Sequence, residues 1–314
     1  MAKPGSTAGR KRYNDFKSFL VNRFGCRVYK LQIDAGFTCP NRDGTIAVGG
    51  CAYCDGRGSS LRQKGPLPAV AQQIAAGKAL YRNLRGASKF IAYFQTFTNT
   101  YAPVERLRAL YDEALAQPDV VGLFIGMRPD CVDEDVLRLL EGYAGRSHVW
   151  VEYGLQTIHD RTLGRMNRGH DSARFVDAVR RTAGRGLFIC AHIILGLPGE
   201  TRSDMMETAR AVAALPVDGI KVHSLLALRG TEVGRLFEEG KIELMGQEDY
   251  VSTVCDVLEI LPPSVVVQRI TAEGYREIYL GPGWAQSKLG VLNAIDREME
   301  KRDTCQGARY MGRG

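Results

Sequence analysis

Residues 120–156, "VVGLFIGMRPDCVDEDVLRLLEGYAGRSHVWVEYGLQ", decide the fold class. Two β-rich runs, 120–127 and 148–156, flank a helical pattern over 133–145. Further β-rich runs cover 28–37, 89–97, 187–197 and 219–228, and helical patterns cover 66–84, 103–116, 171–184 and 203–214. Six strands that alternate with helices predict a parallel sheet with right-handed crossovers. Asp171 and Ser203 are the expected helix N-caps, and Pro103 suits a first helical turn.

Two α/β architectures compete for this alternation. A doubly wound dinucleotide-binding sheet needs a glycine-rich turn directly after its first strand. Here the run 28–37 is followed by a long loop that carries cysteines. We therefore expect a partial (β/α)6 TIM-like barrel, in which reactive residues lie at the C-terminal ends of the strands.

The alternation stops near residue 231. Helical patterns over 231–239, 247–260 and 284–302 flank one apolar strand, "VVVQRI", at 265–270. We expect three parts: a basic N-terminal segment over 1–24, the barrel over 25–230, and a C-terminal α/β extension over 231–314 packed on the barrel.

Composition and charge limit the class of protein. The chain has 314 residues and a formal net charge of +7, and it contains no stretch of about twenty apolar residues. Residues 1–12 hold four cations and no acid, and they lack the apolar centre of a secretory signal. We expect a cytoplasmic protein with a frayed basic tail and no membrane span. The charge fits a polyanionic partner such as RNA, or a tail that only aids solubility.

Three of the eight cysteines are close together, in "TCPNRDGTIAVGGCAYC", residues 38–54. Cys39, Cys51 and Cys54 have the spacing C-x11-C-x2-C, and cytosolic thiols stay reduced. Structural zinc takes four ligands, and Cys26, which precedes the strand, is the one nearby fourth thiol. Three thiolates suit a [4Fe–4S] cluster with one iron open to a small molecule. Glycines at 44, 49 and 50 allow the loop to wrap closely. Cys131, Cys190 and Cys255 are predicted to be small core residues.

Four motifs follow "CAYC" (51–54) in order at successive strand ends: "IGMRPDCV" (125–132), "VEYGLQT" (151–157), "MNRGH" (166–170) and "IILGLPGET" (193–201). Three more lie elsewhere in the chain: "QTFTNTY" (95–101), "VVVQRIT" (265–271) and "WAQSK" (284–288). With them the chain resembles the radical S-adenosylmethionine (SAM) enzymes, in the branch of the Elongator catalytic subunit and the oxygen-independent coproporphyrinogen oxidases. It is most similar to a small bacterial Elongator-like family without an acetyltransferase domain. The first cysteine gap is longer than the family's commonest three-residue version.

The resemblance implies the cofactors and the chemistry. Cys39, Cys51 and Cys54 would bind a [4Fe–4S] cluster whose open iron chelates the methionine group of SAM. An electron from a low-potential donor such as flavodoxin or ferredoxin would then release a 5′-deoxyadenosyl radical. The implied substrate is tRNA, at the C5 side chain of a wobble uridine. The alternatives are a small molecule or a protein side chain as substrate, and a non-catalytic RNA-binding protein stabilised by zinc or a cluster.

The resemblance also implies contacts with SAM near the cysteines. Tyr53 would pack near the adenine, and Gly196 and Leu197 of "GLPGE" would line its pocket, with a plain strand-to-helix turn as the alternative. Gln95 and Thr96 replace a Gly-Gly-acid run that holds the methionine amino group in many relatives. His192 alternates inward before "GLPGE".

Most of the charged residues at other strand ends allow two interpretations. Glu152 and Gln156 share one strand face, and Glu152 would bind a ribose or ammonium group or form an internal salt bridge. Arg168 would pair with the methionine carboxylate. Arg128 and Asp130 would contact cofactor or substrate, or form a structural ion pair.

Basic residues are the candidates for substrate contact. Lys221 and His223 share a face of the sixth strand, and two inward bases favour an anionic substrate; we predict them as the catalytic pair. RNA would dock on the extension, where five cations are available: Arg269, Arg276, Lys288, Arg302 and Arg309.

Overall fold

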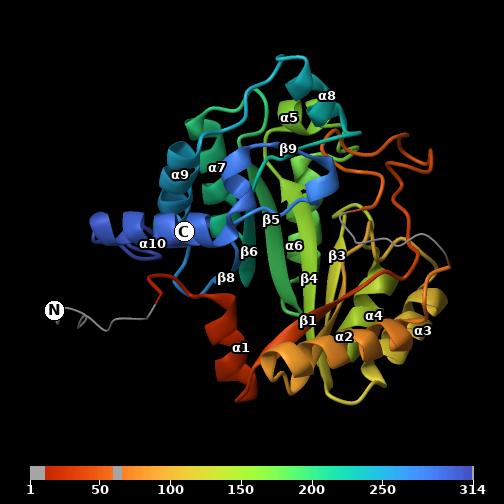
Figure 1. Cartoon of the computed structure of the whole chain (residues 1–314). Coiled ribbons are helices and arrows are strands. Elements are labelled where there is room, and N and C mark those ends of the chain that lie inside the picture. The colour runs from red at the N-terminus through yellow and green to blue at the C-terminus, as the bar shows by residue number, and fades with distance from the viewer. Residues whose placement is uncertain (1–10, 59–65, 313–314) are drawn as a thin grey trace.

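The computed structural model describes residues 11–58 and 66–312, and its centre is one open, curled sheet of seven parallel strands (Figure 1). The order is β1-β2-β3-β4-β5-β6-β8. The strands are β1 (Val28–Ile33), β2 (Lys89–Phe94), β3 (Val120–Met127), β4 (His148–Gln156), β5 (Phe188–Leu195), β6 (Gly219–Ser224) and β8 (Val266–Arg269). Because the strands follow chain order without reversal, the sheet is a partial barrel and not a doubly wound sheet.

Most of the helices that connect the strands cover the outer face of the sheet, whereas α1 lies at one end of the strands and α8 at the other (Figure 1). In chain order, the helices of the described residues are α1 (Phe16–Phe24), α2 (Val70–Arg85), α3 (Val104–Leu115), α4 (Glu134–Ala144), α5 (Asp160–Arg165), α6 (Ser172–Thr182), α7 (Arg202–Ala214), α8 (Glu232–Glu238), α9 (Gln247–Ile260) and α10 (Lys288–Lys301). Asp171 caps α6 as predicted, because its side chain accepts from the Arg174 amide. The Ser203 prediction is wrong: Thr201 caps α7 and forms a reciprocal capping box with Asp204.

The sheet has one strand more than the six expected for the barrel. The apolar run "VVVQRI" supplies β8, which pairs in parallel with β6. Val266 and Val267 are buried there. Part of the expected C-terminal extension therefore completes the barrel sheet. Helices α1 and α5 were not expected, and most of the predicted frayed tail lies outside the described residues.

Aromatic side chains close the barrel at the N-terminal ends of its strands. Helix α1 places Phe19 edge-on to Trp150 at 5.8 Å, and Trp150 stacks on Phe188 at 5.0 Å. Just before α1, the Asn14 carbonyl accepts from the Val267 amide of β8 (2.8 Å). Because aromatic side chains fill this end of the barrel, a polar site is expected at the opposite end, where the C-termini of the strands lie.

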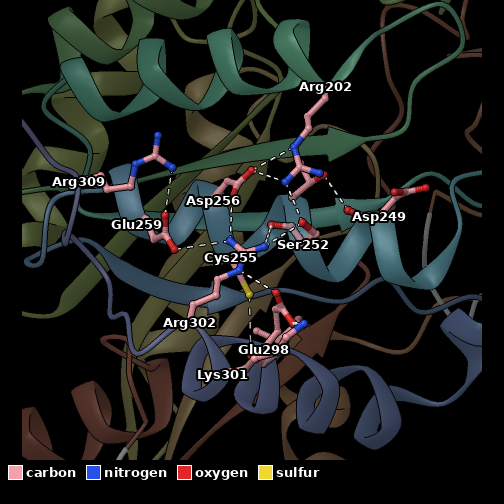
Figure 2. A network of polar contacts seen from close by, with 12 residues as sticks. Arg202, Asp249, Ser252, Cys255, Asp256, Glu259, Glu298, Lys301, Arg302 and Arg309 are labelled. Atoms are coloured by element: carbon pink, nitrogen blue, oxygen red, sulfur yellow. Dashed lines mark hydrogen bonds and ion pairs between the residues drawn. The ribbon is translucent and has the colours of Figure 1, made fainter.

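The extension is held to the barrel by an ion-pair network (Figure 2). Arg202 of α7 and Arg302 after α10 both bind Asp256 of α9, with Arg202 Nε–Oδ2 at 3.1 Å and Arg302 Nη1–Oδ1 at 2.7 Å. Arg309 binds Glu259 at 3.2 Å. Three of the five cations expected to meet RNA are thus engaged by acids within the fold: Arg302 and Arg309 in this network, and Lys288, which pairs with Glu273.

A short antiparallel pair follows the barrel strands. β7 (Ala227–Leu228) pairs with β9 (Tyr279–Gly281), and the 3₁₀ turns η1 (Arg276–Ile278) and η2 (Gly283–Gln286) flank β9. Nowhere in 11–58 and 66–312 is a helix both long enough and apolar enough to cross a membrane.

Candidate active site

The loop after β1 gathers the three cysteines. Gly44, Gly49 and Gly50 all have positive φ, as predicted from the need for a tight wrap. The loop is fastened to the turn before α6: the Ala52 amide donates to the Met166 carbonyl (2.9 Å), and Asn41 Nδ2 donates to the Asn167 carbonyl. Cys39, Cys51 and Cys54 line one cavity of about 190 Å³ at the C-terminal ends of the strands. We call it the cysteine pocket.

Cys51 lies in a positive environment. Arg168 Nη1 donates to Cys51 Sγ at 3.2 Å, and Asn41 Nδ2 lies 3.7 Å from the same sulfur. Burial raises the pKa of Cys51, but the charges of Arg168 and Arg128 outweigh it and hold that pKa below the ordinary thiol value. Burial and the neighbouring Cys51 raise the pKa of Cys54 to about 12. The pocket thus favours one thiolate before any metal binds.

Arg168 and Arg128 are both held by the protein. Arg168 Nη2 donates to the Gly154 carbonyl (2.6 Å). Arg128 forms a bidentate ion pair with Asp130 (2.9 and 2.8 Å) and donates to the Arg168 carbonyl (2.6 Å). The structural ion pair that was the alternative for Arg128 and Asp130 is present, while both arginines also line the cysteine pocket.

Glu152 is the centre of a buried polar network inside the barrel. Its Oε2 accepts from Tyr93 (2.7 Å) and from Lys221, and it lies 3.2 Å from His192 Nε2. Lys221 Nζ also donates to the Tyr93 hydroxyl (2.7 Å). Burial opposes ionisation, yet Lys221 holds the pKa of Glu152 well below its usual range. The internal salt bridge is therefore present, and Tyr153, on the other strand face, bonds Thr182 of α6 (2.7 Å) as the alternation predicts.

A larger chamber of about 470 Å³ adjoins the cysteine pocket. The two cavities share five lining residues: Tyr53, Tyr93, Gln95, Gln156 and His192. Lys221 and His223 line the larger chamber, but Lys221 is paired with Glu152. Burial lowers the pKa of His223 well below its usual value, so the ring is neutral at pH 7.

Other predicted residues fall into two groups. Gln156 has φ of +77° at a bulge in β4, which turns its side chain to both cavities. Gln95 also lines both cavities, whereas Thr96 is buried. Among the described lining residues, Gly196 and Leu197 belong to neither cavity, and Leu197 packs with Ala52 and Met166 below the loop. Their adenine contact stays a prediction.

Two site residues were missed from the sequence. Tyr93 bonds both Glu152 and Lys221, and its position two residues before Gln95, on the same strand face, was the available signal. Asn41 links Cys51 to the Asn167 carbonyl. Its place inside the cysteine loop gave no signal of its own.

Unpartnered buried atoms test whether the pocket fits a cluster and SAM. Glu152 and Arg168 both line the cysteine pocket, and Glu152 Oε1 and Arg168 Nε are buried without a hydrogen-bond partner among the described residues. Buried polar atoms seldom stay unpaired, so these atoms indicate a polar ligand. At Gly154 a Cβ would lie 2.8 Å from Gln156 Nε2 and 3.2 Å from Arg168 Nη2, so glycine at this position lets both side chains lie against the backbone at the pocket. Three thiols, an arginine and these atoms match the donors that the two cofactors require.

Comparisons with known proteins agree with this chemistry. Residues 39–212 match the family model of the radical SAM superfamily, and residues 217–301 match that of the radical SAM C-terminal domain. The Bacillus subtilis (strain 168) protein YtqA is 46% identical over 95% of this chain and 92% of its own length. A tRNA uridine(34) acetyltransferase of Methanocaldococcus infernus is 26% identical over 58% of this chain and 34% of its own. The structure of M. infernus Elp3 superposes with a TM-score of 0.66 at 16% identity, over 89% of this chain and 64% of that one.

The chain belongs to the radical SAM superfamily and is an enzyme of that class. Its cofactors are a [4Fe–4S] cluster and SAM, which together would supply a 5′-deoxyadenosyl radical when both are bound and the cluster is reduced by one electron. The chain's own contribution is positional. We expect Cys39, Cys51 and Cys54 to hold the cluster, with Arg168 beside Cys51. The larger chamber adjoins the cysteine pocket and shares five lining residues with it.

Proposed function

We propose that this enzyme modifies tRNA at the C5 side chain of a wobble uridine. The observation that carries the proposal is the chamber of about 470 Å³ that shares a wall with the cysteine pocket. Its volume is in the range of sites for nucleoside-sized ligands, which fill cavities of about 300–1,000 Å³. A single base turned out of an RNA loop would occupy such a chamber, while the rest of the RNA stays outside.

The activity of a related protein supports uridine as the target. The M. infernus protein that shares 26% identity with 58% of this chain is a tRNA uridine(34) acetyltransferase. This chain matches 34% of that protein. We infer that the shared part prepares the uridine and that the acetyl-transfer activity is not carried over.

Cations near the chamber mouth support an RNA partner. Arg276 and Arg229 are exposed, and the Arg229 amide donates to the carbonyl of Ile278, two residues after Arg276. Arg57 lies over the ring of Tyr275, which lines the chamber (4.9 Å). Arginines beside an aromatic ring suit the phosphates and bases of a single-stranded loop. This proposed surface replaces the one that included Arg302 and Arg309.

The experiment has two measurements. Nucleosides from the tRNA of a deletion strain are compared by mass spectrometry with those of the parent, and we expect an altered wobble uridine. The purified enzyme, reconstituted with iron and sulfide and reduced by flavodoxin or ferredoxin, should release 5′-deoxyadenosine in larger amounts with the deletion strain's tRNA. An unchanged nucleoside profile, with 5′-deoxyadenosine still formed, would assign the enzyme to a small molecule or a protein side chain instead. The proposal places the enzyme in the cytoplasm with its tRNA.

A further inference from the structure

The charges around the larger chamber are almost all cancelled by neighbours. Lys221 is paired with Glu152. Asp55 is paired with Arg57 (3.4 Å), and Glu273 with Lys288 (2.5 Å). These three pairs engage the two acids of the described wall, Asp55 and Glu273, and one of its two Lys or Arg side chains, Lys221.

Arg269 is the exception. It stands on β8 opposite Lys221 of β6 and lines the chamber, half-buried. Across residues 11–58 and 66–312, no acid lies within ion-pair distance of its guanidinium and no hydrogen bond holds it. An arginine that is partly withdrawn from water normally has an anionic partner, because desolvation of an unpaired charge is costly.

Neighbouring polar groups lie on the same wall. Ser224 is buried, lines the chamber, and its Oγ has no hydrogen-bond partner among the described residues. His223, one residue earlier on β6, faces Arg269 and His192, and the charge of Arg269 adds to burial in lowering the pKa of His223. Arg269, Ser224 and His223 therefore offer a charged fork, a hydroxyl and a neutral imidazole to one ligand.

Two of the three arginines that line the cysteine pocket are in a different state, and the third, Arg42, donates to the Gly49 carbonyl (2.9 Å) and lies over the Phe97 ring. Arg128 is neutralised by Asp130, and Arg168 is engaged by Cys51 and the Gly154 carbonyl. Neither lines the larger chamber, and Arg269 is not among the described residues that line the cysteine pocket. The charge of Arg269 is thus directed at the substrate side of the site.

We propose that Arg269 binds an anionic group of the substrate, a carboxylate or a phosphate, with Ser224 and His223 as its neighbouring contacts. The step from anion to RNA rests on the proposed function, whereas the anion site rests on the chamber wall alone. A guanidinium binds both groups through two parallel hydrogen bonds, which a lysine does not reproduce.

The first test does not depend on RNA. Cluster-reconstituted wild type, Arg269→Gln, Arg269→Lys and the control Arg210→Gln are titrated with inorganic phosphate by calorimetry; Arg210 is an exposed arginine on α7. We expect Arg269→Gln to weaken phosphate binding by about tenfold or more, Arg269→Lys to weaken it less, and Arg210→Gln to leave it unchanged. Equal binding by wild type and Arg269→Gln, or no binding by wild type, overturns the proposal. An unchanged iron content shows that the variants are folded.

The second test identifies the source of the anion. Two anticodon hairpins carry a C5-carboxymethyl or a C5-carbamoylmethyl uridine at the wobble position, so that they differ in charge and hardly in shape. If Arg269 binds a carboxylate, wild type prefers the acid by about tenfold and Arg269→Gln removes the preference. If it binds a phosphate, Arg269→Gln weakens both hairpins equally and lowers the salt slope by about one. Loss of phosphate binding with unchanged hairpin binding would keep the anion site and refute tRNA as the substrate.

Discussion

Replacing Lys221 by Met removes the cation that faces Glu152 in the barrel interior. The side chain of Lys221 is 2% exposed and that of Glu152 is 0% exposed, so water cannot take the place of the ammonium group. Tyr93 and His192 still contact the carboxylate. In wild type, burial first and Lys221 second lower the pKa of His192 to about 4, and the burial remains in the variant. Glu152 is expected to take up a proton in the folded variant.

The expected loss of stability follows from this protonation of Glu152. At pH 7 an ordinary glutamic acid lies about 2.7 pH units above its pKa, and each unit is about 1.4 kcal/mol. Lys221→Met should therefore lower the free energy of unfolding by up to about 4 kcal/mol, in line with the roughly 3–5 kcal/mol typical of a broken buried pair. The double variant Glu152→Gln, Lys221→Met removes the charge as well and should recover most of the loss.

The pH dependence gives a second check on the same variant. In wild type the pKa of Glu152 is held below its usual value, so its contribution is present at neutral pH and is lost only in acid. In Lys221→Met the pKa is raised, and the folded state holds a proton that the unfolded state releases. Its deficit should shrink from about 4 kcal/mol at pH 7 to about 1 kcal/mol at pH 5.

Urea unfolding of the apoprotein, followed by circular dichroism at pH 7 and pH 5, measures both quantities. A loss below about 1 kcal/mol at pH 7, or one that does not change with pH, would mean that Glu152 is not a buried, ion-paired carboxylate. A double variant as unstable as Lys221→Met would point to lost packing instead of lost charge.

Three further predictions use matched variants or conditions. Cys51→Ala should lower iron after reconstitution from about four per chain to below one, while Cys255→Ala, in the core, should keep it; equal iron in both would contradict the cluster assignment. Thr201→Ala should cost about 1 kcal/mol by removing the α7 cap, and Ser203→Ala should cost almost nothing; the reverse ranking in urea unfolding would restore Ser203 as the cap. Burial lowers the pKa of His148 to about 4, so the unfolded state binds more protons between pH 6.5 and 4, and wild type should lose about 2 kcal/mol more than His148→Gln from pH 8 to pH 5. Parallel losses in the two proteins would contradict a buried neutral imidazole.

Strand order and strand faces could be predicted from the sequence because both follow from local periodicity. Alternation with period two put Glu152 inside the barrel and Tyr153 outside, and the hydrogen bonds of both agree. The rule that strand ends carry the site also placed Cys39, Cys51 and Cys54 in one cavity. Each of these inferences needs only a strand and its nearest loop.

Partners across the barrel could not be predicted in the same way. Glu152 and Lys221 are separated by 69 residues, and Tyr93 and Glu152 by 59. Periodicity assigns a side chain to a face but not to a register with a strand two places away. Arg302 and Arg309 were expected to contact RNA for a similar reason, because a sequence shows which residues are charged but not which charges are paired. Their acidic partners on α9 could be identified only from the packing of α9 beside α10.

The two cavities differ in which of their cations already have a partner in the protein, and this difference bears on the ligand that each would bind. In the cysteine pocket, Arg168 donates to Cys51 Sγ and Arg128 pairs with Asp130, while Arg42 donates to the Gly49 carbonyl. In the larger chamber the pair of Lys221 and Glu152 is neutral overall, and Arg269 is the cation without an acid among the described residues. A ligand with an anionic group gains more at Arg269 because no protein acid has to be displaced from it. If Arg269 binds the substrate's anionic end at β8, as proposed, the shared wall of Tyr93, Gln95 and Gln156 is left for the part of the substrate that reacts.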